Sequence, residues 1–338
     1  MMWLRRLFLG LLVLVCLLAG AMVMTAMRPA KPVGFQTTQA NGPDGKPFMI
    51  AVWYPSADRP MPTTLAGTGL MSVAKDGVIA GNSLPLIVIS HGNGAGPLAH
   101  VDLALALASA GYVVAAPMHS GDNFLDQSAL ASTTFFNDRS AQFEATLGHI
   151  LGAWSGKAHI DPQRVGAFGF SMGGFTVLNA IGAQPDLRLI ASHCAKAPEF
   201  ACKVLEHAAS PYMKASAPLA GSAFVADPRI KAAVLAAPGM GFTFGEHSLD
   251  QVQVPVQLWL AENDDKVSFL GPLQSALAGK LEEHLVRGAG HLSFLAPCTG
   301  LLRPPALCQD AGDFDRAAFH TSMNASVVTF FDQHLKHR

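Results

Sequence analysis

The hexapeptide GFSMGG, residues 169–174, places one serine among glycines between two apolar stretches. The preceding residues RVGAFGF predict a buried strand, and the following residues FTVLNAIGA predict a helix. A G-x-S-x-G motif at such a junction is typical of the nucleophile elbow, a sharp turn that exposes the serine above the edge of a sheet. The motif therefore predicts that Ser171 is a nucleophile. The alternative is a glycine-rich turn that only packs the strand against the helix.

A serine nucleophile needs a base and an acid that orients the base, in the chain order Ser, Asp or Glu, His. His291 lies in the glycine-flanked stretch RGAGHLSF, after the last predicted strand. Asp264 and Asp265 lie in AENDDKV, directly after the strand before it. We expect His291 to be the base and one of the two aspartates to be the acid. His320 falls in the predicted final helix, where packing or surface exposure is the expected role.

Acyl transfer also needs two backbone N–H groups that stabilise the oxyanion. The residue after the nucleophile, Met172, supplies the first by its position. The loop SHGNGAG follows the predicted strand LPLIVIS and brings the amide of Asn93 to the same place. A phosphate-binding loop is the alternative, but neither G-x-G-x-x-G nor a P-loop Lys-Ser/Thr is present.

Strands and helices alternate along the chain from residue 84 to the C-terminus. Continuous apolar runs such as LPLIVIS and YVVAAP predict strands buried on both faces, and amphipathic stretches lie between them. Residues 33–53 predict an antiparallel hairpin around the turn NGPDGKP. The expected fold is one α/β domain with a doubly wound, mostly parallel sheet and an N-terminal hairpin. Residues 183–228 are expected to form an irregular insertion, either a small cap or lid or a passive loop.

The motifs PLIVISHGNGAG, GFSMGG, AENDDKV and GAGH together resemble the α/β-hydrolase superfamily. Within it, the chain is most similar to the bacterial dienelactone-hydrolase-like group, which also resembles platelet-activating-factor acetylhydrolases. The resemblance implies a Ser-His-Asp triad that hydrolyses carboxylic esters. Family loops at the acid tend to read G-x-x-D-x-x-V, and this frame fits the present sequence only with Asp264, with Ala261 in place of glycine.

The chain departs from these relatives at two places. Dienelactone hydrolases use a cysteine where this chain has Ser171, and the acetylhydrolases carry their acid after the preceding strand, where this chain reads LAAPGM. Secreted polyester hydrolases share the G-x-S-M-G-G elbow. The resemblance therefore implies ester hydrolysis without fixing the substrate.

The expected substrate is an apolar ester or a short acyl lipid, and the chemistry requires no metal or cofactor. The stretch GMGFTF follows a predicted strand, so Met240, Phe242 and Phe244 are expected to form an apolar wall of the site. Hydrolysis of a thioester, an amide or a polyester by the same triad is an alternative. A non-catalytic binding protein with a hydrolase fold is another.

The charge balance of the chain separates it from nucleic-acid-binding proteins. The formal net charge is -1, from 23 Lys and Arg against 24 Asp and Glu. Such a chain produces no long-range field that attracts a polyanion, and no basic stretch with interleaved aromatic residues is present. The expected partner is a small molecule and not a nucleic acid.

The first 26 residues, MMWLRRLFLGLLVLVCLLAGAMVMTA, predict export. Arg5 and Arg6 precede an apolar stretch that ends at Leu18, and a small-residue A-x-A site follows it. This pattern favours a cleaved signal peptide. An uncleaved membrane anchor is the alternative. We expect residues 27–338 to form the catalytic domain, in the periplasm or outside the cell.

Export allows cysteines to persist as disulfides. Four cysteines follow the N-terminal segment, and four cysteines permit three pairings. We expect the two local pairs, Cys194 with Cys202 and Cys298 with Cys308, because each pair brackets a proline-containing segment without clear periodicity. Neither pair has the spacing of a zinc site.

Overall fold

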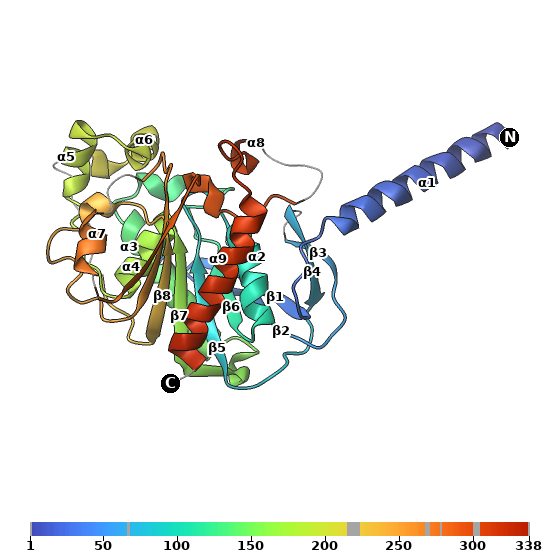
Figure 1. Ribbon diagram of the computed structural model, residues 1–338, viewed down its shortest axis with the longest axis horizontal. Helices are drawn as coiled ribbons and strands as arrows, with labels where there is room; N and C mark the ends of the chain where they lie inside the picture. Colours follow the sequence, from blue (N-terminus) through green and yellow to red (C-terminus); the bar gives the residue numbers. More distant parts are fainter. Residues whose placement is uncertain are drawn as a thin grey trace.

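The computed structural model describes residues 2–65, 68–214, 224–267, 271–277, 279–299 and 305–336. Ten strands of this part of the chain form one sheet, in the order β10-β9-β8-β7-β5-β6-β2-β1-β4-β3 (Figure 1). The strands are β1 (Val33–Asn41), β2 (Pro47–Pro55), β3 (Met61–Leu65), β4 (Thr68–Lys75), β5 (Leu84–Ser90), β6 (Val113–Pro117), β7 (Ile160–Phe170), β8 (Ile230–Ala236), β9 (Val256–Ala261) and β10 (Leu281–Val286).

Helices cover both faces of this sheet (Figure 1). Apolar residues of α3 and α4 share one core cluster with the sheet, and those of α2 and α9 share the other. The α-helices of the described residues are α1 (Met2–Met24), α2 (Val101–Ser109), α3 (Phe135–Gly152), α4 (Met172–Ala180), α5 (Leu189–Lys196), α6 (Phe200–His207), α7 (Gly271–Ala276), α8 (Pro305–Cys308) and α9 (Arg316–Phe331).

The central strands are parallel and buried. β5 pairs in parallel with β6 and β7, and β8, β9 and β10 continue the parallel order. Every residue of β5 is buried, because helices cover both faces of a parallel sheet. The doubly wound α/β architecture predicted from the sequence is confirmed, and the carboxyl ends of these strands meet at one edge.

The N-terminal part of the sheet is antiparallel and larger than predicted. β1 and β2 form the expected hairpin, and β2 pairs antiparallel with β6. β3 and β4, which the sequence analysis did not predict, add a second hairpin beside β1. The residues of β3 are exposed or half-buried, so no apolar run indicates this strand.

Helix α1 projects away from the sheet (Figure 1). Its apolar side chains are exposed, among them Leu7, Leu11 and Leu18. Contact with the domain begins after the helix, where Ala26 is buried and Met27 forms a β-bridge with Met71 of β4. Among the described residues, no helix combines the length and apolar character needed to cross a membrane.

The expected irregular insertion at residues 183–228 contains two short helices, α5 and α6. A disulfide between Cys194 and Cys202 joins them, with 5.4 Å between the Cα atoms. The prediction of an irregular segment was wrong, since α5 and α6 are regular helices. Each has only eight residues, which is too short for a clear apolar period in the sequence. Helices α5 and α6, referred to below as the cap, lie at the edge of the sheet where the parallel strands end (Figure 1).

Candidate active site

Ser171 lies at the turn between β7 and α4, as predicted. Its backbone has φ 53° and ψ -117°, a strained conformation for a residue with a side chain. Two backbone hydrogen bonds hold the turn in place: the Ser171 N–H donates to Ala236 O at 3.0 Å, and the Gly239 N–H donates to Ser171 O at 2.9 Å. The strain is thus maintained by the neighbouring strand β8 and the loop after it.

The glycines around Ser171 are required by close backbone contacts. A Cβ atom on Gly169 would lie 2.2 Å from the Gly173 carbonyl oxygen. A Cβ on Gly173 would lie 1.9 Å from the Ser90 carbonyl oxygen, and one on Gly174 would lie 2.8 Å from Pro238. All three obstacles include backbone atoms, so no side-chain rotation relieves them. The spacing of the motif is therefore a consequence of how tightly α4 approaches β5 and β7.

The structure brings Ser171, His291 and Asp264 into one hydrogen-bonded chain. His291 Nε2 lies 2.9 Å from Ser171 Oγ, and His291 Nδ1 lies 2.8 Å from Asp264 Oδ2. Only 4% of the His291 side chain and 9% of the Asp264 side chain are exposed. Because a carboxylate only accepts hydrogen bonds, Nδ1 carries the proton and Nε2 accepts from the serine hydroxyl. This arrangement fits general-base activation of Ser171.

Asp264 and Asp265 have different hydrogen-bond partners and different exposure. Asp264 Oδ1 accepts the backbone N–H groups of Lys266 and Val267, both at 2.9 Å, which leaves Oδ2 for His291. The Asp265 side chain is 69% exposed and pairs with Lys266 at 2.8 Å. The hydrogen bond from Lys266 lowers the pKa of Asp265 from its usual value.

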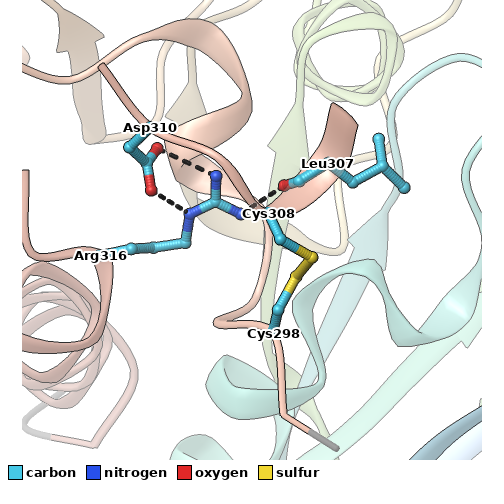
Figure 2. Close-up of a disulfide and its surroundings, with 5 residues drawn as sticks. All are labelled: Cys298, Leu307, Cys308, Asp310 and Arg316. Atoms are coloured by element: carbon cyan, nitrogen blue, oxygen red, sulfur yellow. Dashed lines mark hydrogen bonds and ion pairs between the residues drawn. A yellow bond between two sulfur atoms is a disulfide. The ribbon is translucent and has the colours of Figure 1, made fainter. Parts of the chain in front are cut away.

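The buried ion pair of Arg316 and Asp310 supports the loop that carries His291. Ser293 Oγ accepts the Gly290 N–H at 3.0 Å and donates to Asp310 at 2.6 Å. Figure 2 shows Arg316 of α9 between Asp310 and the Leu307 carbonyl oxygen, beside the disulfide of Cys298 and Cys308. The segment after His291 is thereby tied to α9.

The loop that carries Asn93 is held by Asp122 and Arg139, two residues that the sequence analysis missed. Asp122 Oδ1 accepts from Asn93 Nδ2 at 2.6 Å and from the Gly94 N–H at 2.8 Å. Asp122 Oδ2 pairs with Arg139, whose side chain is 2% exposed. Arg139 also donates to the His91 carbonyl oxygen at 2.5 Å and to Thr176 of α4 at 3.2 Å. This buried pair therefore connects the Asn93 loop to the helix that follows Ser171.

The histidines beside this pair are neutral. The backbone N–H of His119 donates to His91 Nε2 at 3.2 Å, and His91 Nδ1 donates to the Gly92 carbonyl oxygen at 2.8 Å. Burial, with a smaller contribution from the Arg139 charge, lowers the pKa of His91 to about 3. The same two causes lower the pKa of His119 well below its usual value. Asp122 is thus the counter-ion of Arg139, and the histidines add no charge under the Asn93 loop.

A cavity of about 40 Å³ opens beside Ser171. The cap supplies one wall through Phe200, Val204 and Leu205 of α6. The charged residues Glu199 and Lys266 also line it, and the Lys266 ammonium group lies 4.7 Å from the centre of the Phe200 ring. The remaining lining residues are Asn93, Leu130, Ser171, Met172, Ala201, Gly239, Met240 and Val267.

The predicted apolar wall is only partly correct. Met240 lines the cavity, but Phe242 and Phe244 do not. Phe242 stacks on His193 of α5 with ring centres 3.7 Å apart, and Phe244 packs against Phe175 of α4. The loop after β8 turns into a 3₁₀ turn at residues 241–243, which carries both aromatic rings into the core.

Residues 64–150 match the model of a family described as platelet-activating factor acetylhydrolase, isoform II. No curated protein matches the chain.

No cluster of three or more potential metal ligands occurs in the part of the chain that the structure describes.

Solved structures show the same architecture. A ferulic acid esterase from Streptomyces cinnamoneus superposes with a TM-score of 0.59 at 20% identity, covering 93% of this chain and 94% of that one. A puromycin-hydrolyzing peptidase from Mycobacterium tuberculosis superposes with a TM-score of 0.53 at 16% identity, covering 88% of this chain and 39% of that one. The protein has the α/β-hydrolase fold.

Proposed function

We propose that this α/β-hydrolase-fold protein is a serine carboxylic ester hydrolase with Ser171, His291 and Asp264 as its catalytic triad. The observation that carries the proposal is the continuous chain of hydrogen bonds from the Asp264 carboxylate through His291 to the strained Ser171. A binding protein would have no need of this buried, directed arrangement. The match to an acetylhydrolase family and the structural likeness to an esterase agree with it.

The proposed mechanism is acyl transfer in two steps. Ser171 Oγ attacks the ester carbonyl carbon while His291 Nε2 takes the hydroxyl proton, and Asp264 stabilises the imidazolium. The N–H groups of Met172 and Asn93 donate to the oxyanion. When the tetrahedral intermediate collapses, the proton passes from His291 to the leaving alcohol. Water then attacks the acyl-enzyme with His291 as base, which releases the acid and restores Ser171.

The proposed substrates are esters with short, apolar acyl groups, including short acyl lipids. The cavity beside Ser171 is small, and it is enclosed mainly by apolar side chains such as Val204 and Met240. Apolar walls favour apolar groups because burial removes apolar surface from water. Thioesters, amides and polyesters remain substrates to be compared with esters in the assay below.

We also propose that the protein is exported, to the periplasm or outside the cell. The two disulfides are compatible with an oxidising compartment. The exposed apolar helix α1 is proposed to be a signal peptide, or a membrane tether if it is retained. N-terminal sequencing of the mature protein tests this, and a start near residue 22 supports cleavage after the A-x-A site.

A panel of p-nitrophenyl esters from acetyl to palmitoyl, with a matched anilide and thioester, tests the function. We expect the protein to hydrolyse the short esters fastest and Ser171→Ala to lose this turnover. Far-UV circular dichroism of both proteins controls for folding. If the folded protein shows no Ser171-dependent turnover of any member, the esterase proposal is wrong and a binding function is favoured.

A further inference from the structure

His320 of α9 lies directly behind the His291 loop. The residue is 3% exposed. Its Nδ1 lies 2.7 Å from Asp102 Oδ2, and its Nε2 lies 2.9 Å from the Ser293 carbonyl oxygen. The sequence predicts packing or surface exposure for His320. The structure instead places it between helix α2 and the loop that carries the base of the triad.

Both partners of His320 are hydrogen-bond acceptors. A carboxylate and a backbone carbonyl oxygen have no proton to donate, so each ring nitrogen of His320 has to carry one. A neutral imidazole has a single N–H, whereas an imidazolium has two. His91 shows the contrasting case, because one of its nitrogens accepts the His119 N–H.

The shared proton belongs to His320 rather than to Asp102. Asn324 Nδ2 donates to the same Asp102 Oδ2 at 2.7 Å, which favours an ionised carboxylate. Burial acts to raise the pKa of Asp102, but the hydrogen bonds and charge of His320, together with Asn324, bring it below its usual value. Asp102 is therefore the counter-ion of a cationic His320.

The other charged and titratable groups around His320 are already accounted for. Burial is the main cause that lowers the pKa of His100 to about 4, so His100 adds no positive charge near Asp102 at neutral pH. Arg316, one turn earlier on α9, pairs with Asp310 at 2.8 Å. Helix α9 thus presents two cations toward the loop, each with its own carboxylate.

We propose that His320 is a positioning residue for His291, an imidazolium whose two N–H groups clamp the Ser293 carbonyl to Asp102. Ser293 is then held at two points, by its hydroxyl on Asp310 and by its carbonyl on His320. Ser293 is two residues after His291 in the same 3₁₀ turn, residues 291–294. The clamp therefore fixes the direction in which the imidazole of His291 faces Ser171. This inference rests on the proposed esterase function.

Loss of the clamp should affect turnover more than binding. His320 is not among the residues that line the cavity beside Ser171, so substrate contacts persist when it is changed. A misplacement of about 1 Å of a catalytic group costs about 100-fold in rate. For His320→Gln, which supplies only one side-chain NH₂ group toward two acceptors, we expect kcat to fall about 10- to 100-fold, with KM within about threefold of the original value.

The first test compares the kinetics of His320→Gln and His247→Gln. His247 forms an exposed ion pair with Asp250 at 3.2 Å, so it provides the same substitution in a His–Asp pair on the surface. The control should retain the original kcat. A folded His320→Gln protein with the original kcat overturns the proposal. So does a variant in which only KM changes.

The second test needs no turnover. In spectra of protein with ¹⁵N-labelled histidine at pH 7, we expect one ring with both nitrogens in the protonated, imidazolium range. Its signals should be missing from Asp102→Asn, in which a neutral His320 accepts from the new amide and still donates to Ser293. If no such signal occurs in the unmodified protein, the clamp is refuted even where His320→Gln fails to fold. Ser171→Ala separately decides the esterase function, so failure of one proposal is distinguishable from failure of the other.

Discussion

Asp264 and Asp265 are adjacent in the sequence, but their surroundings give them different chemistry. Both oxygens of Asp264 are occupied by donors that orient it toward His291. Asp265 faces solvent and Lys266. Only Asp264 is therefore able to hold the imidazole in the tautomer that leaves Nε2 free for Ser171.

Replacement of each aspartate by asparagine should separate the two roles. An asparagine at a triad position favours the wrong histidine tautomer and lowers kcat by about 10⁴-fold. We expect this loss for Asp264→Asn, and nearly original turnover for Asp265→Asn, measured with p-nitrophenyl acetate. Severe loss of turnover in Asp265→Asn with normal turnover in Asp264→Asn would show that Asp265 is the triad acid.

Asp122 is expected to affect the oxyanion site through Asn93. In Asp122→Asn, an amide group replaces one carboxylate oxygen, so either Arg139 or Asn93 faces another donor. Loss of one oxyanion donor costs about 10²- to 10³-fold in kcat, and we expect a loss of about 10- to 100-fold here because the Asn93 amide is displaced rather than removed. KM should change little. The steady-state parameters for a short ester give both values.

Asp161→Asn is the matched control for Asp122→Asn. Asp161 pairs with Arg164 at 2.8 Å, but their side chains are 30% and 27% exposed. Partly exposed pairs contribute about 1 kcal/mol or less, whereas disruption of a buried pair costs about 3 to 5 kcal/mol. Urea unfolding should therefore show a large loss of stability only for Asp122→Asn. Equal kcat in the two variants would contradict a positioning role for Asp122.

The helices and strands that the sequence predicted are those with a clear apolar pattern. β5, β6 and α2 were predicted because buried parallel strands and amphipathic helices leave periodic signals. β3 was missed because its residues are largely exposed. α5 and α6 were missed because each spans only eight residues.

The residues of the candidate site likewise fall into those that a sequence pattern indicates and those that it does not. The motif around Ser171 and the chain order of acid and base indicated three residues, which the structure brings together. Asp122, Arg139 and His320 act through contacts between elements, so no local pattern reports them. One signal was present: Arg139 lies close to the apolar pair FF at residues 135–136, and a charge buried among such residues requires a partner.

The cap helix α6 should control which acyl groups the enzyme accepts. Phe200 lines the cavity and is 42% exposed, so it lies where the cavity meets solvent. Truncation by Phe200→Ala removes this boundary. We expect the ratio of kcat/KM for hexanoate over acetate esters to rise about threefold to tenfold, because each methylene that a pocket accommodates is worth about 10-fold or more.

Leu189→Ala on α5 is the control for this change. Leu189 is 38% exposed, close to the value for Phe200, but it is not among the residues that line the cavity. Its acyl preference should match that of the original protein. If both variants shift the preference equally, the effect comes from loosening of the cap and not from the wall at Phe200.

At the scale of the whole molecule, buried neutral histidines link stability to pH. Burial lowers the pKa of His91 to about 3 and that of His100 to about 4, and the pKa of His119 is also well below its usual value. In the unfolded chain these groups titrate near pH 6.5. Below that pH the unfolded state binds more protons, so the free energy of unfolding falls as the pH falls toward 4.

Urea unfolding at several pH values tests this linkage. Between pH 7 and pH 5, each such histidine should cost up to about 2 kcal/mol of stability. His100→Leu should flatten the dependence, because leucine does not titrate and His100 Nε2 has no hydrogen-bond partner among the described residues. The same slope in His100→Leu and in the original protein would show that His100 is not a source of the pH dependence.

The two disulfides join cysteines that are only 8 and 10 residues apart, and this has a consequence for oxidative folding. The entropy lost on closing a loop grows with the logarithm of its length. A crossed pairing would close loops of roughly a hundred residues and cost about 2 kcal/mol more. The native pairs are therefore those that the unfolded chain closes most readily. The entropy of loop closure alone thus favours the native pairs over the crossed ones, without a contribution from contacts in the parallel sheet.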